Sequence, residues 1–211
     1  MARTRASDYD DKRRAILNRS AELFSEHGYN RASMNAIAAA CGVSKPNLYH
    51  YYKDKEELLF DVIRFHLEEL LEVVEAADHP ELAPEARLRQ LVAALLDAYR
   101  DADSQHSVQI SSLRFLSASR QADLKALERE LVRIFSDAVR GIAPHLEGTK
   151  LLKPVTMSLF GMLNWHYLWF KSSGAVSRAD YAELVTTLFT DGTRNLRELP
   201  APRSVRRAAT K

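Results

Sequence analysis

The sequence predicts an all-α protein, with three helices at its N-terminal end and a larger helical part after them. Apolar residues recur at three- and four-residue spacing along most of the 211 residues, which is the spacing of helices that bury one face. Seven glycines and seven prolines interrupt this pattern, and such residues mark the ends of helices. No run of alternating apolar and polar residues is long enough to indicate a strand.

The composition favours a water-soluble protein with a sizeable core, because 46% of the residues are hydrophobic and 27% are charged. No apolar run follows the basic start, and the longest uncharged stretch, residues 154–170, is shorter than the roughly 20 residues of a membrane helix. Cys41 is the only cysteine, which excludes intrachain disulfides and multi-cysteine zinc sites. We expect a cytoplasmic protein without a membrane partner, a cofactor or a metal ion.

The net charge of +2 conceals an asymmetry along the chain. Residues 1–54 hold nine Lys and Arg against six Asp and Glu, whereas residues 55–199 hold 17 against 22, and residues 200–211 hold four against none. A basic first part is compatible with a nucleic-acid partner, because phosphate contacts dominate the affinity for DNA. We expect one domain at 1–54, a second at 55–199 and a disordered basic tail at 200–211.

The chain begins with a basic segment, residues 1–8, in which Arg3 and Arg5 have no apolar neighbours. We expect a disordered arm that either touches DNA or only increases solubility. A helix is predicted over residues 9–27, because its apolar positions recur at helical spacing and Gly28 stands at the position of a C-terminal cap.

Two short helices joined by a tight turn are predicted next. Ser33 and Ser44 each precede one of them, at the position where a hydroxyl accepts hydrogen bonds from free amides. Gly42 lies between and supplies the backbone freedom that a tight turn needs. Pro46 falls in the first turn of the second short helix, where no N–H is needed. This order is typical of a helix-turn-helix motif.

The second short helix carries side chains suited to DNA contact. Leu48 and Tyr52, four residues apart, can anchor one face. Lys and Asn can bond base edges in the major groove, whereas hydroxyl, imidazole and ammonium groups suit phosphate oxygens. The alternative, a core cluster of the aromatic residues, is disfavoured because so short a helix cannot bury every face. The outward candidates are Lys45, Asn47, Tyr49, His50 and Tyr51.

A long fourth helix is predicted to begin after Asp54, with Glu57 completing a variant of the capping box. Lys55 lies in its first turn, where the helix dipole disfavours a cation. A phosphate held there would explain the lysine, and a solvated side chain explains it equally well. The wide apolar band that follows indicates a helix that packs on two sides and ends near His79.

Further helices are expected in the remainder of the chain. Ser177 and Asp180 form a capping box at the start of the last one. The last two are the most apolar, and such surfaces require a partner. The expected ranges are 85–101, 105–118, 121–142, 152–173 and 178–196.

The first quarter of the chain closely resembles the DNA-binding domain of the TetR family of transcriptional regulators. The resemblance covers roughly residues 9–60 and lies in the order and spacing of particular residues, with Tyr52 where the family usually has Phe. The matching residues are Phe24, Gly28-Tyr29, Ile37-Ala38, Gly42-Val43-Ser44, Leu48-Tyr49, Lys55 and Glu57-Leu58.

The resemblance implies a ligand-responsive regulator that binds double-stranded operator DNA. It implies a homodimer, in which the last two helices pack against their copies as a four-helix bundle. Such a dimer reads half-sites about one helical turn (~34 to 36 Å) or more apart. The residues nearest the bases would be Ser44, Lys45, Pro46 and Asn47, and the phosphate contacts would be Ser33, Tyr49, His50 and Lys55.

A cavity for a small effector in the second domain follows from the same resemblance. The run FGMLNWHYLWF, residues 160–170, resembles family members that respond to acyl-coenzyme A thioesters. We expect such an apolar effector to release a repressor from a palindromic operator. The alternative is that the aromatic residues fill the core or the dimer interface. The candidates for the wall of the cavity are Tyr99, His106, Phe115, Phe135, Phe160, Trp165, His166 and Trp169.

An enzyme and a helical scaffold are the competing functions. The sequence contains no nucleophile elbow, no HExxH motif and no phosphate loop, so we do not expect an enzyme. A scaffold that binds other proteins through its last helices would leave the polar residues of the helix-turn-helix without a role.

Overall fold

The computed structural model describes residues 2–196, and the side chains from residue 9 onward. Within that range the chain folds into nine α-helices and three short 3-10 helices, with no strand, which confirms the all-α prediction. No helix among these residues is both long and apolar enough to cross a membrane. The α-helices are α1 Ala2–His27, α2 Met34–Ala40, α3 Lys45–Tyr51, α4 Lys55–Ala77, α5 Pro84–Ala98, α6 Asp103–Ser112, α7 Ala118–Ile142, α8 Leu152–Asn164 and α9 Arg178–Arg194.

Three predicted helix boundaries are wrong by more than three residues. The first helix begins at Ala2 and not near residue 9, so the prediction of a disordered arm is wrong for residues 2–8. These residues contain no Gly or Pro and include good helix formers. The helix expected over 105–118 ends at Ser112, and a 3-10 turn, Leu113–Phe115, follows it. The helix expected over 152–173 ends at Asn164, and a 3-10 turn, His166–Leu168, follows it. Aromatic side chains lose rotamer freedom in a helix, and the run after Asn164 is dense in them. The predicted tail, 200–211, lies outside the described residues.

The capping residues predicted for the fourth and last helices are confirmed. The carboxylate of Asp54 accepts a hydrogen bond from the amide of Glu57 at 2.7 Å, although the Glu57 side chain accepts from the amide of Lys53 and not from that of Asp54. Ser177 and Asp180 form a complete capping box: each side chain accepts from the backbone amide of the other, at 3.1 and 3.0 Å.

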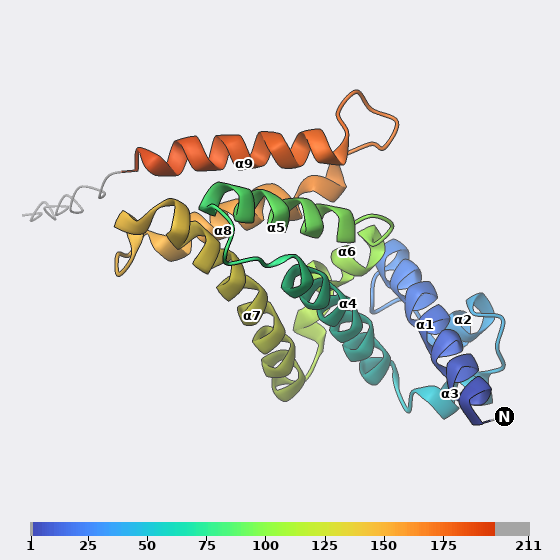
Figure 1. The fold of residues 1–211 in the computed structure, drawn as a ribbon. Helices are drawn as coiled ribbons and strands as arrows, with labels where there is room; N and C mark the ends of the chain where they lie inside the picture. Colours follow the sequence, from blue (N-terminus) through green and yellow to red (C-terminus); the bar gives the residue numbers. More distant parts are fainter. Residues whose placement is uncertain (1, 197–211) are drawn as a thin grey trace, which may run out of the picture.

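The first hydrophobic core joins α1, α2 and α3 to the N-terminal half of α4. Two of its largest fully buried side chains are Phe24 of α1 and Tyr52, which follows α3. Val108 of α6 and Leu124 of α7 also belong to this core. The helix-turn-helix is therefore packed directly against the beginning of the larger helical part, at one end of the molecule (Figure 1).

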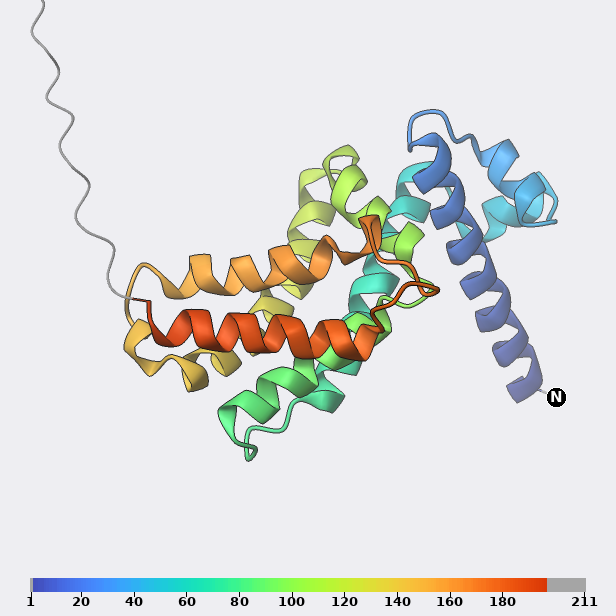
Figure 2. The ribbon, with the colours of Figure 1, turned by 90° about the horizontal axis from the view of Figure 1, so that it is seen from above.

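The second core lies among α4, α5, α7, α8 and α9. α5 packs against α9 on one side and against α4 and α7 on the other, and α9 lies across α5 and α8 (Figures 1 and 2). Its centre is apolar and fully buried, with Leu91 and Leu95 of α5, Phe135 of α7 and Leu163 of α8 at 0% exposure.

α4 is the only helix among the described residues that contributes several buried side chains to both cores. Leu58, Leu59 and Ile63 lie in the first core, whereas Leu70 and Val74 lie in the second. The change from one core to the other takes place between Leu67 and Leu70, which is less than one turn of helix. A displacement of α4 would therefore change the packing of both cores.

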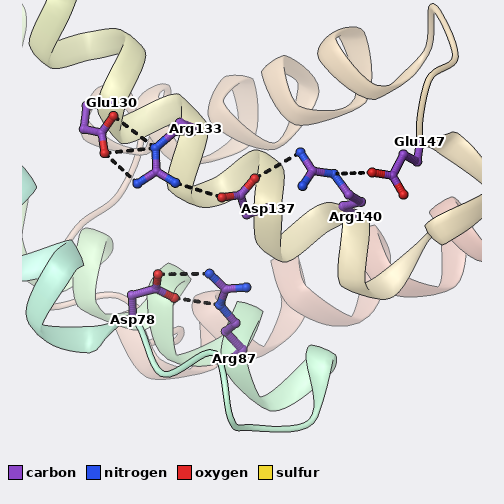
Figure 3. A network of polar contacts seen from close by, with 7 residues as sticks. All are labelled: Asp78, Arg87, Glu130, Arg133, Asp137, Arg140 and Glu147. Atoms are coloured by element: carbon purple, nitrogen blue, oxygen red, sulfur yellow. Dashed lines mark hydrogen bonds and ion pairs between the residues drawn. The ribbon is translucent and has the colours of Figure 1, made fainter.

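Ion pairs follow the outer face of α7 and close the turn between α4 and α5 (Figure 3). Arg87 donates two hydrogen bonds to Asp78, at 2.6 and 2.9 Å, and both side chains are largely shielded from solvent. The pairs on α7 are more exposed, and exposed pairs contribute little to stability because solvent screens them. They join Glu130, Arg133, Asp137, Arg140 and Glu147 in one chain.

Candidate functional site

Two serine caps hold the helix-turn-helix in shape. The hydroxyl of Ser33 accepts a hydrogen bond from the amide of Ala36 at 3.1 Å, and that of Ser44 accepts one from the amide of Asn47 at 3.3 Å. Gly42, in the turn, has a φ of 65°, in the left-handed region that glycine tolerates. Because each serine oxygen acts as an acceptor here, its own proton remains available to a phosphate or a base.

One face of α3 is buried against the core, and the other face is exposed to solvent. Leu48 and the following cap residue Tyr52 are 0% and 1% exposed, as their spacing predicts. Tyr49 is 43% exposed. A helix held in this way can enter a groove of DNA without giving up its own packing. The other side chains of this helix that were expected to contact DNA are also exposed: Lys45, Pro46, Asn47 and His50.

Several of the residues expected to contact phosphates line one shallow concavity of about 350 Å³ beside α3. Ser33 and Lys55 reach it from the starts of α2 and α4, and Lys45 and Tyr49 reach it from α3. The Lys45 ammonium lies over the Tyr49 ring, 5.9 Å from its centroid. Arg31 also lines the concavity and was missed in the sequence, although a basic residue two positions before a helix cap is a recognisable signal.

The remaining aromatic residues of α3 lie apart from this concavity. Tyr51 stacks on Tyr9 of α1, with ring centroids 4.9 Å apart, and so contributes to packing. His50 is exposed and meets the Tyr51 ring edge-on at 5.9 Å. Tyr51 therefore braces α3 against the N-terminal part of α1.

Lys55 makes contacts within the protein that the sequence does not reveal. Its ammonium donates to the main-chain carbonyls of Tyr29 at 2.8 Å, Ala32 at 2.9 Å and Asn30 at 3.4 Å. It also lies over the ring of Tyr29, 4.4 Å from the centroid. Partial burial lowers the pKa of Lys55. The side chain links the loop between α1 and α2 to the start of α4. A phosphate bound here would have to compete with these carbonyls for the N–H donors of Lys55.

Phe115 packs against the first core and not the second, at the junction where the helix-turn-helix meets the rest of the chain. Its ring stacks on that of Tyr29, with centroids 5.1 Å apart. Tyr29 in turn carries the Lys55 ammonium on its face. Phe115, Tyr29 and Lys55 therefore form a continuous series of contacts from the turn after α6 to the loop before α2. The series ends at Lys55, which lines the concavity next to α3.

Glu56 forms a second link at the same junction. Its carboxylate accepts a hydrogen bond from the amide of Ser117 at 3.0 Å and forms an ion pair with Arg120 at 3.2 Å. The hydrogen bond from the Ser117 amide, together with Arg120, lowers the pKa of Glu56. The first turn of α4 is thereby attached to the start of α7.

A cavity of about 200 Å³ lies among α4, α5, α6, α7 and α8. Most of its wall is apolar and includes Leu70 and Phe160, and its polar groups come from Tyr99, Asn164, Gln109 and Glu128. Gln109 donates to Glu128 at 3.0 Å, and its buried amide oxygen has no partner. An apolar cavity with a few convergent polar groups is the usual form of a small-molecule site.

A buried polar layer lies on one side of this cavity. The Tyr99 hydroxyl donates to the side-chain oxygen of Asn164 at 2.8 Å, and a ring nitrogen of His106 bonds the Asn164 carbonyl at 3.1 Å. The His106 ring lies 4.5 Å from that of Tyr99 and 6.0 Å from that of His66. Burial and the nearby His106 lower the pKa of His66 to about 3.

The structure separates the other residues expected to line the effector cavity. Phe135 stacks edge-on against Phe160 at 5.0 Å and is buried in the second core. Trp165 and Trp169 are 56% and 50% exposed on the outer surface. His166 is buried but lines a different cavity, near the start of α9. Among the described residues no group of His, Cys, Asp and Glu is arranged to hold a metal ion.

Comparison with protein families identifies two matching segments. Residues 16–62 match the family model described as bacterial regulatory proteins, tetR family. Residues 81–193 match the model described as tetracyclin repressor-like, C-terminal domain. Together the matches cover both the helix-turn-helix and the helical part behind it.

Individual relatives agree with these matches. A TetR-family transcriptional regulator from Bordetella parapertussis is 35% identical, with a TM-score of 0.80 over 89% of this chain and 98% of that one. AibR, solved with isovaleryl coenzyme A and operator DNA, is 27% identical, with a TM-score of 0.74 over 85% of this chain and 98% of that one. The transcriptional activator FasR of Mycolicibacterium smegmatis is 36% identical over 96 residues, and the match spans 46% of this chain and 43% of FasR.

Replacing Lys55 by Met should destabilise the helix-turn-helix, because it leaves the carbonyls of Tyr29 and Ala32 without their donor. We expect the free energy of unfolding, measured by urea titration, to fall by about 1 to 3 kcal/mol. Lys53→Met removes a neighbouring exposed lysine and should change it by less than about 0.5 kcal/mol. Equal effects of the two substitutions would show that the carbonyl contacts of Lys55 contribute nothing.

Acid should destabilise the protein through its buried histidines. Burial lowers the pKa of His66, His106 and His166 in the folded state. Below about pH 6.5 the unfolded chain therefore binds more protons than the folded chain. The free energy of unfolding should therefore fall as the pH is lowered from about 6.5. His66→Phe should reduce this slope by up to about 1.4 kcal/mol per pH unit, measured by urea titration at pH 6, 5 and 4.5. A slope unaffected by His66→Phe would contradict the prediction.

Proposed function

This chain belongs to the TetR family of transcriptional regulators, and from that premise we propose that it is a repressor released from a palindromic operator by a small apolar effector. DNA binding and transcription regulation come with the family and its helix-turn-helix. The relatives are transcriptional regulators and not enzymes. We propose that residues 1–54 bind the operator and residues 55–199 bind the effector and a second subunit.

We propose that α3 enters the major groove and reads the operator. The observation that carries this proposal is the exposed face of α3 beside a concavity into which several polar and basic residues converge. Ammonium, hydroxyl and guanidinium groups suit phosphate oxygens, and the first turn of a recognition helix lies nearest the bases. The base contacts would be Ser44, Lys45, Pro46 and Asn47, and the phosphate contacts would be Ser33, Tyr49, His50 and Lys55, together with Arg31.

A homodimer through α8 and α9 is the second element of the proposal. On α9, Tyr181, Val185 and Phe189 are buried against the second core, whereas Leu184 and Leu188 are 50% and 58% exposed. Their four-residue spacing places them on one outward stripe of the helix. Met157 on α8 and Trp165 after it add further exposed apolar surface. Pairing with a second copy would cover this surface and supply two reading helices.

The effector is proposed to be an acyl-coenzyme A thioester, with its acyl group in the cavity beside Tyr99. The cavity of about 200 Å³ is mainly apolar and suits a short acyl chain. AibR, whose structure contains isovaleryl coenzyme A, aligns over 85% of this chain. Its ligand makes a branched short-chain thioester the natural first probe.

Release would follow from unequal affinity of the effector for two conformations, because a ligand shifts an equilibrium only by its differential affinity. Leu67 and Leu70 of α4 line the cavity, and Lys55 and Glu56 at the other end of α4 contact the junction near the reading helix. A movement of α4 that admits the acyl group would therefore alter the spacing of the two readers.

The proposed function is tested by binding to the DNA upstream of the protein's own gene. We expect a gel shift with nanomolar to micromolar affinity and a steep loss of affinity as salt rises, because phosphate contacts release counterions. Binding that is independent of salt, or no stronger than to unrelated DNA of equal length, would contradict a specific regulator.

Asn47→Ala should change sequence preference, because the Asn47 side chain is proposed to face base edges. We expect an affinity loss of about 1 to 3 kcal/mol on the natural operator that disappears at one altered base pair. Tyr49→Phe, which removes only a hydroxyl, should weaken binding to all sequences alike. Both effects are measured by competition among single-base operator variants; a uniform loss for Asn47→Ala would overturn its assignment.

Leu188→Glu should convert the dimer into monomers, because it places a charge on the apolar surface proposed to pair. Light scattering coupled to size exclusion measures the mass of the particle. Leu82→Glu, on an exposed leucine in the connection between α4 and α5, should leave the dimer intact. A wild-type monomer, or a dimer unaffected by Leu188→Glu, would show that subunits pair elsewhere or not at all.

A further inference from the structure

A second cavity, of about 480 Å³, lies between the turn from α5 to α6 and the connection from α8 to α9. These two segments lie next to each other in Figure 2. Unlike the cavity beside Tyr99, this one is lined mainly by charged and hydroxyl side chains. Three basic residues from three different segments line it, Arg100, Lys171 and Arg178, and the Arg100 guanidinium also donates to Asp97.

Arg178 is held in place at this cavity with one of its nitrogens unpaired. Its guanidinium lies 4.8 Å from the centroid of the Phe170 ring, over its face, and this contact fixes the direction of the side chain. Its Nε is buried and has no hydrogen-bond partner. A buried N–H without an acceptor is unfavourable, so a site of this kind gains stability when an acceptor binds.

His166 provides a second unpartnered nitrogen at the same cavity. The residue is 2% exposed, and its ring stacks on those of Phe170 and Tyr181 at 4.2 and 5.3 Å. Its Nε2 is buried without a partner. The Nε of Arg178 and the Nε2 of His166 are thus both buried without a hydrogen-bond partner, close to three basic residues. This arrangement indicates a ligand with several acceptor oxygens.

The backbone around the cavity also favours negative charge. α6 begins at Asp103 and α9 begins at Arg178, so the positive ends of two helix dipoles lie at its wall. Asp101 and Asp103 are acidic members of the wall, and they disfavour a ligand that carries only negative charges. A nucleotide, which combines phosphates with N–H donors on its base, meets both kinds of side chain.

A row of three contacting rings, Tyr167, His106 and Tyr99, runs from this cavity to the one beside Tyr99. Tyr167 lines the charged cavity, and its ring lies 5.2 Å from that of His106. His106 lies 4.5 Å from Tyr99, which lines the apolar cavity. An elongated molecule that lies along this row, with an apolar end and a phosphorylated end, would meet a matching cavity at each end of it.

We propose that the cavity formed by Arg100, Lys171 and Arg178 binds the phosphate groups of the effector, whose acyl end occupies the cavity beside Tyr99. The inference rests on the proposed function, since it assigns the second half of the same ligand. Arg178 and the His166 nitrogen would bond phosphate oxygens, and the rings of Tyr167 and Phe170 would flank the nucleotide.

Calorimetric titration with three probes tests the proposal on the full chain. The probes are isovaleryl coenzyme A, the isovaleryl thioester of N-acetylcysteamine, which lacks phosphates, and adenosine 3′,5′-bisphosphate, which lacks the acyl group. Arg178→Gln and Lys171→Gln should each weaken binding of isovaleryl coenzyme A and of the bisphosphate about tenfold or more. Both should leave binding of the phosphate-free thioester unchanged.

Lys153→Gln is the matched control, because it removes one exposed lysine near the other end of α8. It should bind all three probes like the wild type. Bisphosphate binding that Arg178→Gln abolishes would support the phosphate site even if neither thioester bound, although the acyl effector would then be wrong. Thioester binding without bisphosphate binding, or bisphosphate binding equal in wild type and both variants, would overturn the phosphate site and leave the acyl effector standing.

Discussion

The structure depends on the sharing of α4 between two hydrophobic cores. Leu58, Leu59 and Ile63 hold its first half among α1, α2 and α3, whereas Leu70 and Val74 hold its second half among the helices of the larger core. Packed cores resist continuous deformation. A change in the packing of one half of α4 therefore has to be accommodated in the other half, and this is the physical basis for communication between a cavity and a reading helix.

The contacts at the junction of the helix-turn-helix with the rest of the chain are chemically mixed, in contrast to the apolar first core beside them. Lys55 donates to carbonyls of the loop before α2, Tyr29 stacks on Phe115, and Glu56 accepts from the amide of Ser117. Hydrogen bonds and stacked rings have directional preferences. A small rotation of α4 would weaken several of them together, so the junction can have two distinct arrangements and not a graded series.

The sequence predicted the helix-turn-helix in detail because its boundaries are determined locally. Ser33, Gly42 and Ser44 act through their own backbone neighbours, and the caps lie where they were expected. The second domain was harder, because nothing local states which of many aromatic residues face a cavity. Phe115 belongs to the junction and Trp165 to the outer surface, and both placements depend on how helices far apart in sequence pack. The charged cavity near Arg178 could not be predicted for the same reason.

The most direct test of communication through α4 measures the affinity for operator DNA with and without saturating isovaleryl coenzyme A, and the affinity for isovaleryl coenzyme A with and without saturating operator. Linkage requires the two factors to be equal. We predict that each ligand weakens the other by the same factor, on the order of 5- to 150-fold. Isovaleryl coenzyme A that binds the protein and leaves operator affinity unchanged would contradict the account.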